Sequence, residues 1–341
     1  MENNERKHNI SLSNKANQAP SLGEGGGGFI GSKAPSLGEG GGGCQEHGGV
    51  GLQETGTAGC CNYVCECNRA FNAETLHPLV SLIDMSAPCS CGCIKTDCYS
   101  VVLKHRAGDC VKYGRRHYDF ADATMLFVTP RKDVDLCTND GKMLIFHPDL
   151  VRCTPLGMKL GDYTFFKYRQ DESLHISCCE ERVVERCLGS ISDELAWGVD
   201  EYSKPIICTA IELLLGYCRR FYTRQFITRH DANVDAIAAL DKLIDGAFAS
   251  GEIASSGLPT ASRLAPRLDM SACYLDDMLK SETGCTVTEY VRLRRIKLAK
   301  RMLMAGDRSV DEISYLLGFS NVKCFAVVFK KVTGVEPCDY R

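Results

Sequence analysis

Short apolar runs separated by turn residues occupy the chain from about residue 71 to residue 161. Such runs, interrupted by Gly-, Asp- and Asn-containing turns, are typical of strands in an antiparallel sheet. The expected strands are Tyr99–Leu103, Cys110–Tyr113, Thr124–Val128 and Met143–Phe146. Their near-regular spacing predicts a small antiparallel β-barrel or sandwich.

The apolar positions change to helical spacing beyond residue 170. Ser177 and Glu180 are spaced as a capping box, which predicts a helix over 177–197. Two more helices are expected at about 203–226 and 234–248. The first of these two has one broad apolar stripe, formed by Ile207, Ala210, Ile211, Leu214, Leu215, Cys218 and Tyr222. A stripe of this width can pack on the strands.

The last 33 residues contain two short helices joined by a tight turn. Ser309 and Glu312 can cap the first helix reciprocally, and Gly318 ends it where a left-handed residue is favoured. Ser320 is expected to cap the second helix, which runs from about 321 to 332. The apolar face of this helix contains Phe325, Val328, Phe329 and Val332. These are the elements of a helix-turn-helix, although a helical hairpin that only packs has the same spacing.

The C-terminal segment closely resembles the signature of AraC/XylS-type transcription regulators. The matching parts are S-V-x-E-I-x-x-x-x-G-F-S, F-x-x-x-F-K-K-x-x-G and P-x-x-Y-R, in that order. Four more segments resemble a subgroup of these regulators that is common in Bacteroides-like bacteria: FNAETLHPLVSLID, YDFADATMLFVTP, LIFHPDLVRCTPLG and IELLLGYCRRFYTRQFITR. The resemblance implies an α+β fold. A small antiparallel cupin-like β-barrel and a helical region would precede an all-α double helix-turn-helix domain.

Five segments follow from these patterns. They are a disordered Gly-rich, Cys-containing extension (1–70), a cupin-like sensor domain (71–170), a helical dimerisation and connector region (171–249), a linker (250–257) and the DNA-binding domain (258–341). The extension contains the sequence APSLGEGGGG twice, at 19–28 and 34–43, and has almost nothing to bury. The resemblance also implies a homodimer, for which the apolar stripe could be the seam. It further implies a small-molecule effector in the barrel, and double-stranded DNA and RNA polymerase as partners.

Each DNA-binding unit would place its second helix in the major groove. Matching the family's motif residue by residue gives the base-facing positions Cys273, Asp276 and Asp277 in the first unit, and Val322, Lys323, Cys324 and Val327 in the second. The expected phosphate contacts are Arg292, Arg295, Lys330 and Arg341.

The first unit departs from this pattern in two ways. Base reading usually relies on Arg, Lys, Asn or Gln, whereas the first reading helix offers two carboxylates, which repel phosphate. Pro266 also falls inside the preceding helix, where it removes a backbone hydrogen bond. We therefore expect the second unit to dominate DNA binding.

Charge is distributed unevenly along the chain, whose formal net charge is −3. Residues 258–341 contain 14 Lys and Arg against 10 Asp and Glu, and the remainder contains 26 against 33. A basic end on an acidic body suits a nucleic-acid-binding module. No apolar run is long enough for a membrane span, and the N-terminus lacks the apolar core of a signal peptide, so we expect a cytoplasmic location.

Cysteine is abundant, with 21 residues, eight of which form two clusters: Cys60, Cys61, Cys65 and Cys67, then Cys89, Cys91, Cys93 and Cys98. Their spacing matches no established zinc finger, and we expect no metal site or cofactor. The scattered His105, His117 and His147 do not form a cupin metal motif, so we expect no catalysis. Two alternatives stay open: a degenerate DNA-binding protein without effector sensing, and a cysteine-based metal or redox sensor.

Overall fold

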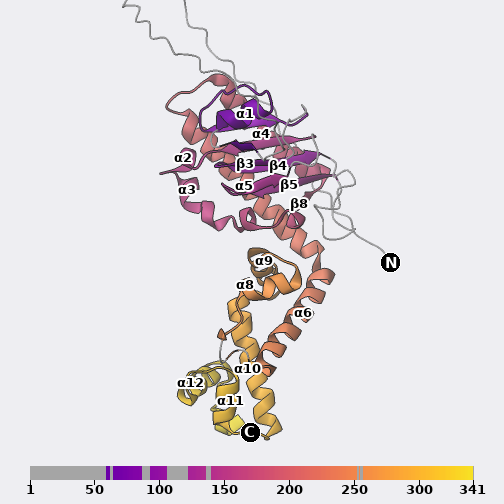
Figure 1. Ribbon diagram of the computed structural model, residues 1–341, viewed down its shortest axis with the longest axis vertical. Coiled ribbons are helices and arrows are strands. Elements are labelled where there is room, and N and C mark those ends of the chain that lie inside the picture. Colours follow the sequence, from indigo (N-terminus) through magenta and orange to yellow (C-terminus); the bar gives the residue numbers. More distant parts are fainter. Residues whose placement is uncertain are drawn as a thin grey trace, which may run out of the picture. The chain divides into compact units, whose positions relative to one another are not determined.

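The computed structural model describes residues 59–61, 64–86, 93–105, 122–135, 140–251, 253 and 256–340 (Figure 1). The chain divides into two units, residues 1–54 and 55–341, and every described residue belongs to the second unit. The Gly-rich repeats therefore lie outside the described residues.

Two sheets form the first part of this unit. The larger has five antiparallel strands in the order β2 (Val80–Asp84), β7 (Lys142–Phe146), β4 (Tyr99–His105), β5 (Ala123–Val128) and β8 (Leu174–Ile176). The smaller contains β1 (Gly59–Cys61), β3 (Cys93–Thr96) and β6 (Asp133–Asp135). Three of the expected strands are confirmed as β4, β5 and β7, and the fourth, 110–113, lies outside the described residues. Closure into a cupin-like barrel stays a prediction.

Both faces of the five-stranded sheet are covered. Successive side chains of a strand point to opposite faces, so Val102 of β4 packs into one apolar core and Val101 into the other. The first core contains Val64 and Cys67 of α1 (Val64–Ala70), whose side chains are fully buried. The fold thus begins before residue 71, and the expected boundary after residue 70 separates α1 from the sheet that it covers.

In the second core, the long helices α4 (Cys178–Trp197) and α5 (Ser203–Thr228) pack on the sheet. The same core continues through α6 (His230–Ala249) into the C-terminal helices, against which α6 packs. Of the predicted α5 stripe, all members except the half-buried Ala210 are buried within the chain itself. The stripe therefore packs on the sheet and is not an open dimer seam. Short turns connect β7 to β8: α2 (Pro148–Val151), α3 (Pro155–Lys159), η2 (Leu160–Asp162), η3 (Thr164–Lys167) and η4 (Gln170–Glu172).

The C-terminal part is all-helical. Its elements are α8 (Ala261–Leu264), η5 (Ala265–Leu268), α9 (Ala272–Thr283), α10 (Val287–Ala305), α11 (Val310–Leu316), α12 (Val322–Thr333) and η6 (Pro337–Tyr340). Pro266 acts as the sequence suggests: α8 stops after one turn, and Pro266 is the second residue of the 3₁₀ turn η5, where its missing N–H costs little. Ile253, in the expected linker, is buried in the same core.

Candidate nucleic-acid interface

Two short helices around a tight turn form the second unit, as predicted. Ser309 and Glu312 make the expected capping box at the start of α11. The helix ends at Gly318, whose φ of +71° suits glycine, and the amide of Phe319 donates to the carbonyl of Ser314 (3.0 Å). Asn321, and not Ser320, caps α12: its Oδ1 accepts from the amide of Cys324 at 2.8 Å.

Aromatic packing fixes the orientation of α12. Phe325 and Phe329 are fully buried, with ring centroids 5.5 Å apart, and Tyr340 of η6 lies edge-on to Phe329 at 5.3 Å. Val328 and Val332, expected on the same face, are 41% and 47% exposed. The buried face is therefore narrower than the apolar pattern suggested, because only two side chains of α12 anchor it.

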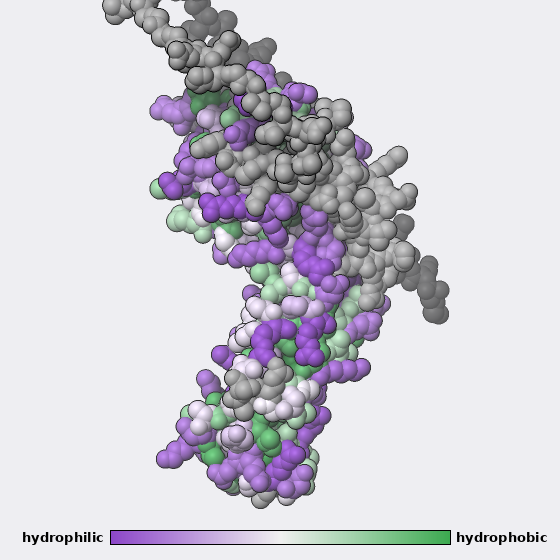
Figure 2. Space-filling model, viewed as in Figure 1, coloured by the Kyte–Doolittle hydropathy of each residue, from purple (hydrophilic) through white to green (hydrophobic). Residues whose placement is uncertain are grey.

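The opposite side of α12 faces away from this core. Lys323 and Cys324 are exposed, Val322 is half-buried, and Val327 is 69% exposed. Three of the four predicted base-facing residues of the second unit are thus left exposed by the rest of the described chain, and Val322 is partly covered. On the side drawn in Figure 2, hydrophobic and hydrophilic side chains lie side by side over the C-terminal helices.

The predicted phosphate-contacting residues differ in their surroundings. Arg292 is exposed on α10, and Lys330 forms an ion pair with Glu336 (2.8 Å). Arg295 has a structural position: its Nε donates to the carbonyl of Leu317 (2.6 Å), and its guanidinium lies 3.2 Å from the centroid of the Phe319 ring. Burial lowers the pKa of Arg295 to about 10. Arg341 lies outside the described residues.

Ion pairs connect the joining helix α10 to α6. Arg294 makes 2.9 Å contacts with both Asp241 and Asp245, and Arg301 reaches Asp245 at 3.3 Å. Hydrogen bonds from Arg294 lower the pKa of Asp245. Arg294 and Arg301 are therefore engaged by this chain, as Arg295 is, which sequence spacing did not indicate.

The predicted base-facing residues of the first unit are also engaged by this chain. Asp276 Oδ1 accepts from the amide of Val287 (2.8 Å) and so caps α10, and Asp277 Oδ2 accepts from the hydroxyl of Tyr168 (2.7 Å). Cys273 is half-buried, and burial raises the pKa of its thiol. The second helices of the two helix-turn-helix units thus have opposite environments: the outer face of α12 is open, whereas α9 is covered.

No group of three or more His, Cys, Asp or Glu side chains within the described ranges could hold a metal ion. Cys65 is exposed, whereas Cys67 and Cys98 are buried, and several members of the two cysteine clusters lie outside those ranges. No helix in the described part of the chain is long and apolar enough to span a membrane.

Comparison with known proteins identifies the C-terminal part. Residues 264–341 match the family model described as a helix-turn-helix domain. The chain is 42% identical over 76 residues to the transcriptional regulatory protein YesN of Bacillus subtilis (22% of this chain, 21% of YesN). It is 35% identical over 78 residues to the transcription factor PqrA of Proteus vulgaris (23% of this chain, 64% of PqrA). The activator RhaS of Yersinia pestis is 35% identical over 78 residues (23% of this chain, 29% of RhaS).

Among solved structures, the DNA-binding domain of AdpA in complex with a target DNA covers 30% of this chain and 87% of that domain, at 26% identity and a TM-score of 0.25. The chain spans less than two thirds of the length of each curated relative named above. These relatives are named as transcriptional regulators, and each matches this chain over only 76 or 78 residues. Residues 264–341 therefore form a helix-turn-helix domain.

Proposed function

We propose that the protein is a sequence-specific, DNA-binding transcription regulator of AraC type that acts in the cytoplasm. The observation that carries this proposal is the division of α12 into two sides. Phe325 and Phe329 anchor the helix in its own domain, while Lys323 and Val327 project from the opposite side. A short helix that is anchored on one side, and that exposes both polar and apolar side chains on the other, suits insertion into the major groove.

The second unit reads the bases in this proposal. Lys323 can donate to guanine O6 and N7, and Val322 and Val327 can contact thymine methyl groups, with Cys324 beside them. Arg292, Lys330 and Arg341 contact phosphates, which adds salt-dependent affinity without sequence preference. The ion pair of Lys330 with Glu336 is solvent-exposed and worth little, so phosphate can replace the carboxylate. The position of Arg295 favours a structural role in holding the turn before α12.

The N-terminal part acts as a cupin-like sensor of a small effector and as a dimerisation region, and the regulator contacts RNA polymerase, as the family resemblance implies. The side of α5 that faces away from the sheet supports a dimer contact. Leu213 and Ile206 on α5 are 55% and 48% exposed, and Trp197 at the end of α4 and Tyr202 just before α5 are 88% and 63% exposed. Four exposed large apolar side chains on α5 and the segment that leads into it favour a second copy as their partner.

Selection from random duplexes tests the DNA-binding proposal. The full chain is incubated with a random-sequence duplex pool at low salt, and bound duplexes are sequenced. We expect one enriched motif, and Lys323→Ala should alter or lose part of it. Lys242→Ala, which removes an exposed lysine from α6, is the matched control and should leave the motif unchanged. Absence of any enriched motif for the unaltered chain would contradict the proposal.

A further inference from the structure

The helix α9 contacts the N-terminal part of the chain through the side that it would present to DNA. Tyr168, just after η3, donates its hydroxyl hydrogen to Asp277 Oδ2 at 2.7 Å. Burial, together with the carboxylate of Asp277, raises the pKa of Tyr168 well above its ordinary value, so the phenol stays a neutral donor. Cys273 packs against the apolar core. The predicted base-facing positions of α9 therefore contact this chain.

A fully buried carboxylate fixes the start of α9. Glu172 of η4 accepts the amide of Ser271 at Oε1 (2.7 Å) and the amide of Arg169 at Oε2 (2.8 Å). Arg169 in turn contacts Asp269 at 2.6 Å. A buried carboxylate is costly unless its oxygens are paired. Here Oε1 is paired with the C-terminal part of the chain and Oε2 with the N-terminal part. Separating α9 from η4 would leave this carboxylate without one of those partners.

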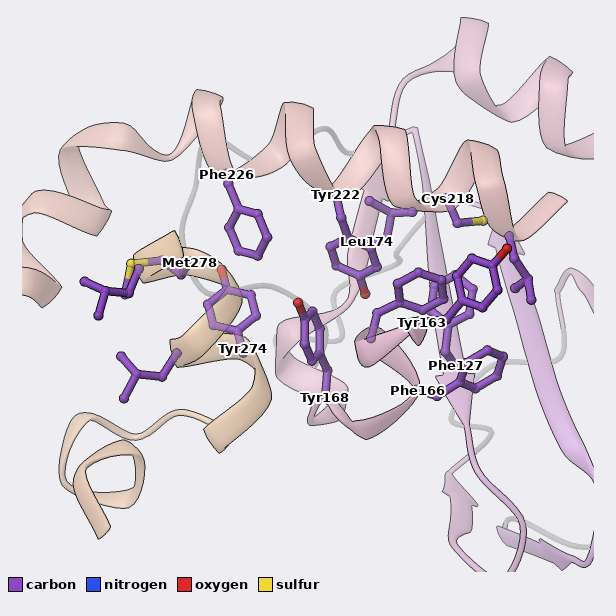
Figure 3. Close-up of a cluster of buried hydrophobic side chains, with 14 of the residues drawn as sticks. Phe127, Tyr163, Phe166, Tyr168, Leu174, Cys218, Tyr222, Phe226, Tyr274 and Met278 are labelled. Carbon is purple, nitrogen blue, oxygen red and sulfur yellow. The ribbon is translucent and has the colours of Figure 1, made fainter. Parts of the chain in front are cut away.

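An aromatic cluster continues this contact along α5 (Figure 3). Tyr274 of α9 lies edge-on to Tyr168, with ring centroids 5.2 Å apart, and 5.3 Å from Phe226. Tyr168 is also edge-on to Tyr222 at 5.3 Å. The hydroxyl of the buried Tyr274 accepts from Arg229 Nη1 at 2.9 Å. Packed aromatic rings with satisfied hydroxyl groups are typical of a stable protein–protein contact.

The other end of α9 is held as well. Glu282 accepts from Asn233 Nδ2 (2.8 Å) and lies 2.8 Å from His230 Nδ1, both on α6. Polar contacts at the start, middle and end of α9, with an aromatic centre, define one continuous surface on a helix of 12 residues.

We propose that α9 is a protein-docking helix, whose partner is the η3–η4 segment with the adjoining ends of α5 and α6, and that it does not read bases. This inference rests on the proposed function, because it assigns base reading to α12 alone within each chain. It explains why Asp276 and Asp277 occupy positions that would repel DNA: one caps α10, and the other binds Tyr168. A conformational change in the η3–η4 segment would alter its contacts with α9 and so act directly on the DNA-binding domain.

Hydrogen exchange of the full chain tests the docking. Tyr168→Phe removes the hydroxyl and keeps the ring. Tyr163→Phe makes the same chemical change on a buried tyrosine five residues earlier, whose hydroxyl makes no hydrogen bond to α9 within the described structure. A hydrogen bond to a charged group stabilises by about 1.5–3 kcal/mol, so Tyr168→Phe should speed amide exchange in α9 by roughly tenfold to a hundredfold. Equal exchange in the two variants would overturn the proposal.

Duplex selection separates this inference from the proposed function. Asp277→Ala should leave the enriched motif unchanged, whereas Lys323→Ala should change it. A motif altered at specific base pairs by Asp277→Ala means that α9 reads bases, and the docking inference is then wrong while the regulator function stands. Failure of the unaltered chain to enrich any motif, with exchange in α9 still controlled by Tyr168, removes the proposed function and leaves the docking contact.

Discussion

Replacing Gly318 by Ala should destabilise the second helix-turn-helix unit more than the same change at other left-handed glycines. Two effects add at this position. The φ of +71° places an L-residue in the left-handed region, at a cost of about 1–2 kcal/mol. A Cβ on Gly318 would also overlap Cγ2 of the buried Ile253, and overpacking of this kind costs about 1–3 kcal/mol more.

Gly306 provides the matched control. Its φ is also +71°, but a Cβ there would meet nothing within 4 Å. Gly306→Ala should therefore show only the backbone cost, and Gly318→Ala should lose about 1–3 kcal/mol beyond it. For a folded unit of this size that difference corresponds to a further fall in Tm of about 2–12 °C.

Thermal and urea unfolding of the full chain measure both variants. The cost of Gly318→Ala should fall to that of Gly306→Ala when it is measured in an Ile253→Ala background, because the overlapping methyl group is then absent. If the two glycine substitutions cost the same in the unaltered chain, the contact between Ile253 and the α11–α12 turn does not exist as described.

Three further changes test other parts of the structure. Phe329→Ala should lower the free energy of unfolding by about 3–5 kcal/mol in urea titrations, whereas Val327→Ala, at a 69% exposed site on the same helix, should stay within about 0.5 kcal/mol. The pKa of Asp245 is lowered by Arg294, so its stabilising contribution is present above the ordinary carboxyl pKa and is lost as pH falls through the lowered value. Asp245→Asn should accordingly reduce stability at neutral pH and flatten its loss in acid, as measured by urea unfolding across pH; an unchanged acid limb would contradict the pairing. Leu213→Glu should shift the protein towards monomer in sedimentation analysis without lowering its Tm, and an unchanged oligomeric state would exclude this side of α5 as the dimer contact.

Local patterns were enough to place most elements. The strands β4, β5 and β7, the long helices and the capping boxes at Ser177 and Ser309 all follow from periodicity and short-range hydrogen bonding, and each is confirmed within a few residues. The N-cap residue of α12 was predicted one position too early. Ser320 and Asn321 can both cap a helix, and the turn geometry after Gly318 selected Asn321. The helix α1 was missed because its short apolar pattern follows a Gly-rich stretch, and only the sheet gives it something to cover.

The motif match was more useful on α12 than on α9, because the partners of the α9 residues lie far away in the sequence. On α12 the motif match identified residues that do lie on the open side. On α9 the same match selected Asp276 and Asp277, whose partners Val287 and Tyr168 are 11 and 109 positions away. The sequence showed that these carboxylates were unusual for base reading, but it contained no signal for what they bind. Arg295 illustrates the same limit, since its contact with Phe319 depends on how α10 packs against the turn.

The amino-acid sequence by itself determined the helices, several strands and the helix-turn-helix motif, because these depend on spacing and interactions over a few residues. Tertiary structure alone decided which charged side chains remain available for DNA. That choice depends on contacts between segments about a hundred residues apart, such as Tyr168 with Asp277 and Glu172 with Ser271, and no local pattern encodes such contacts.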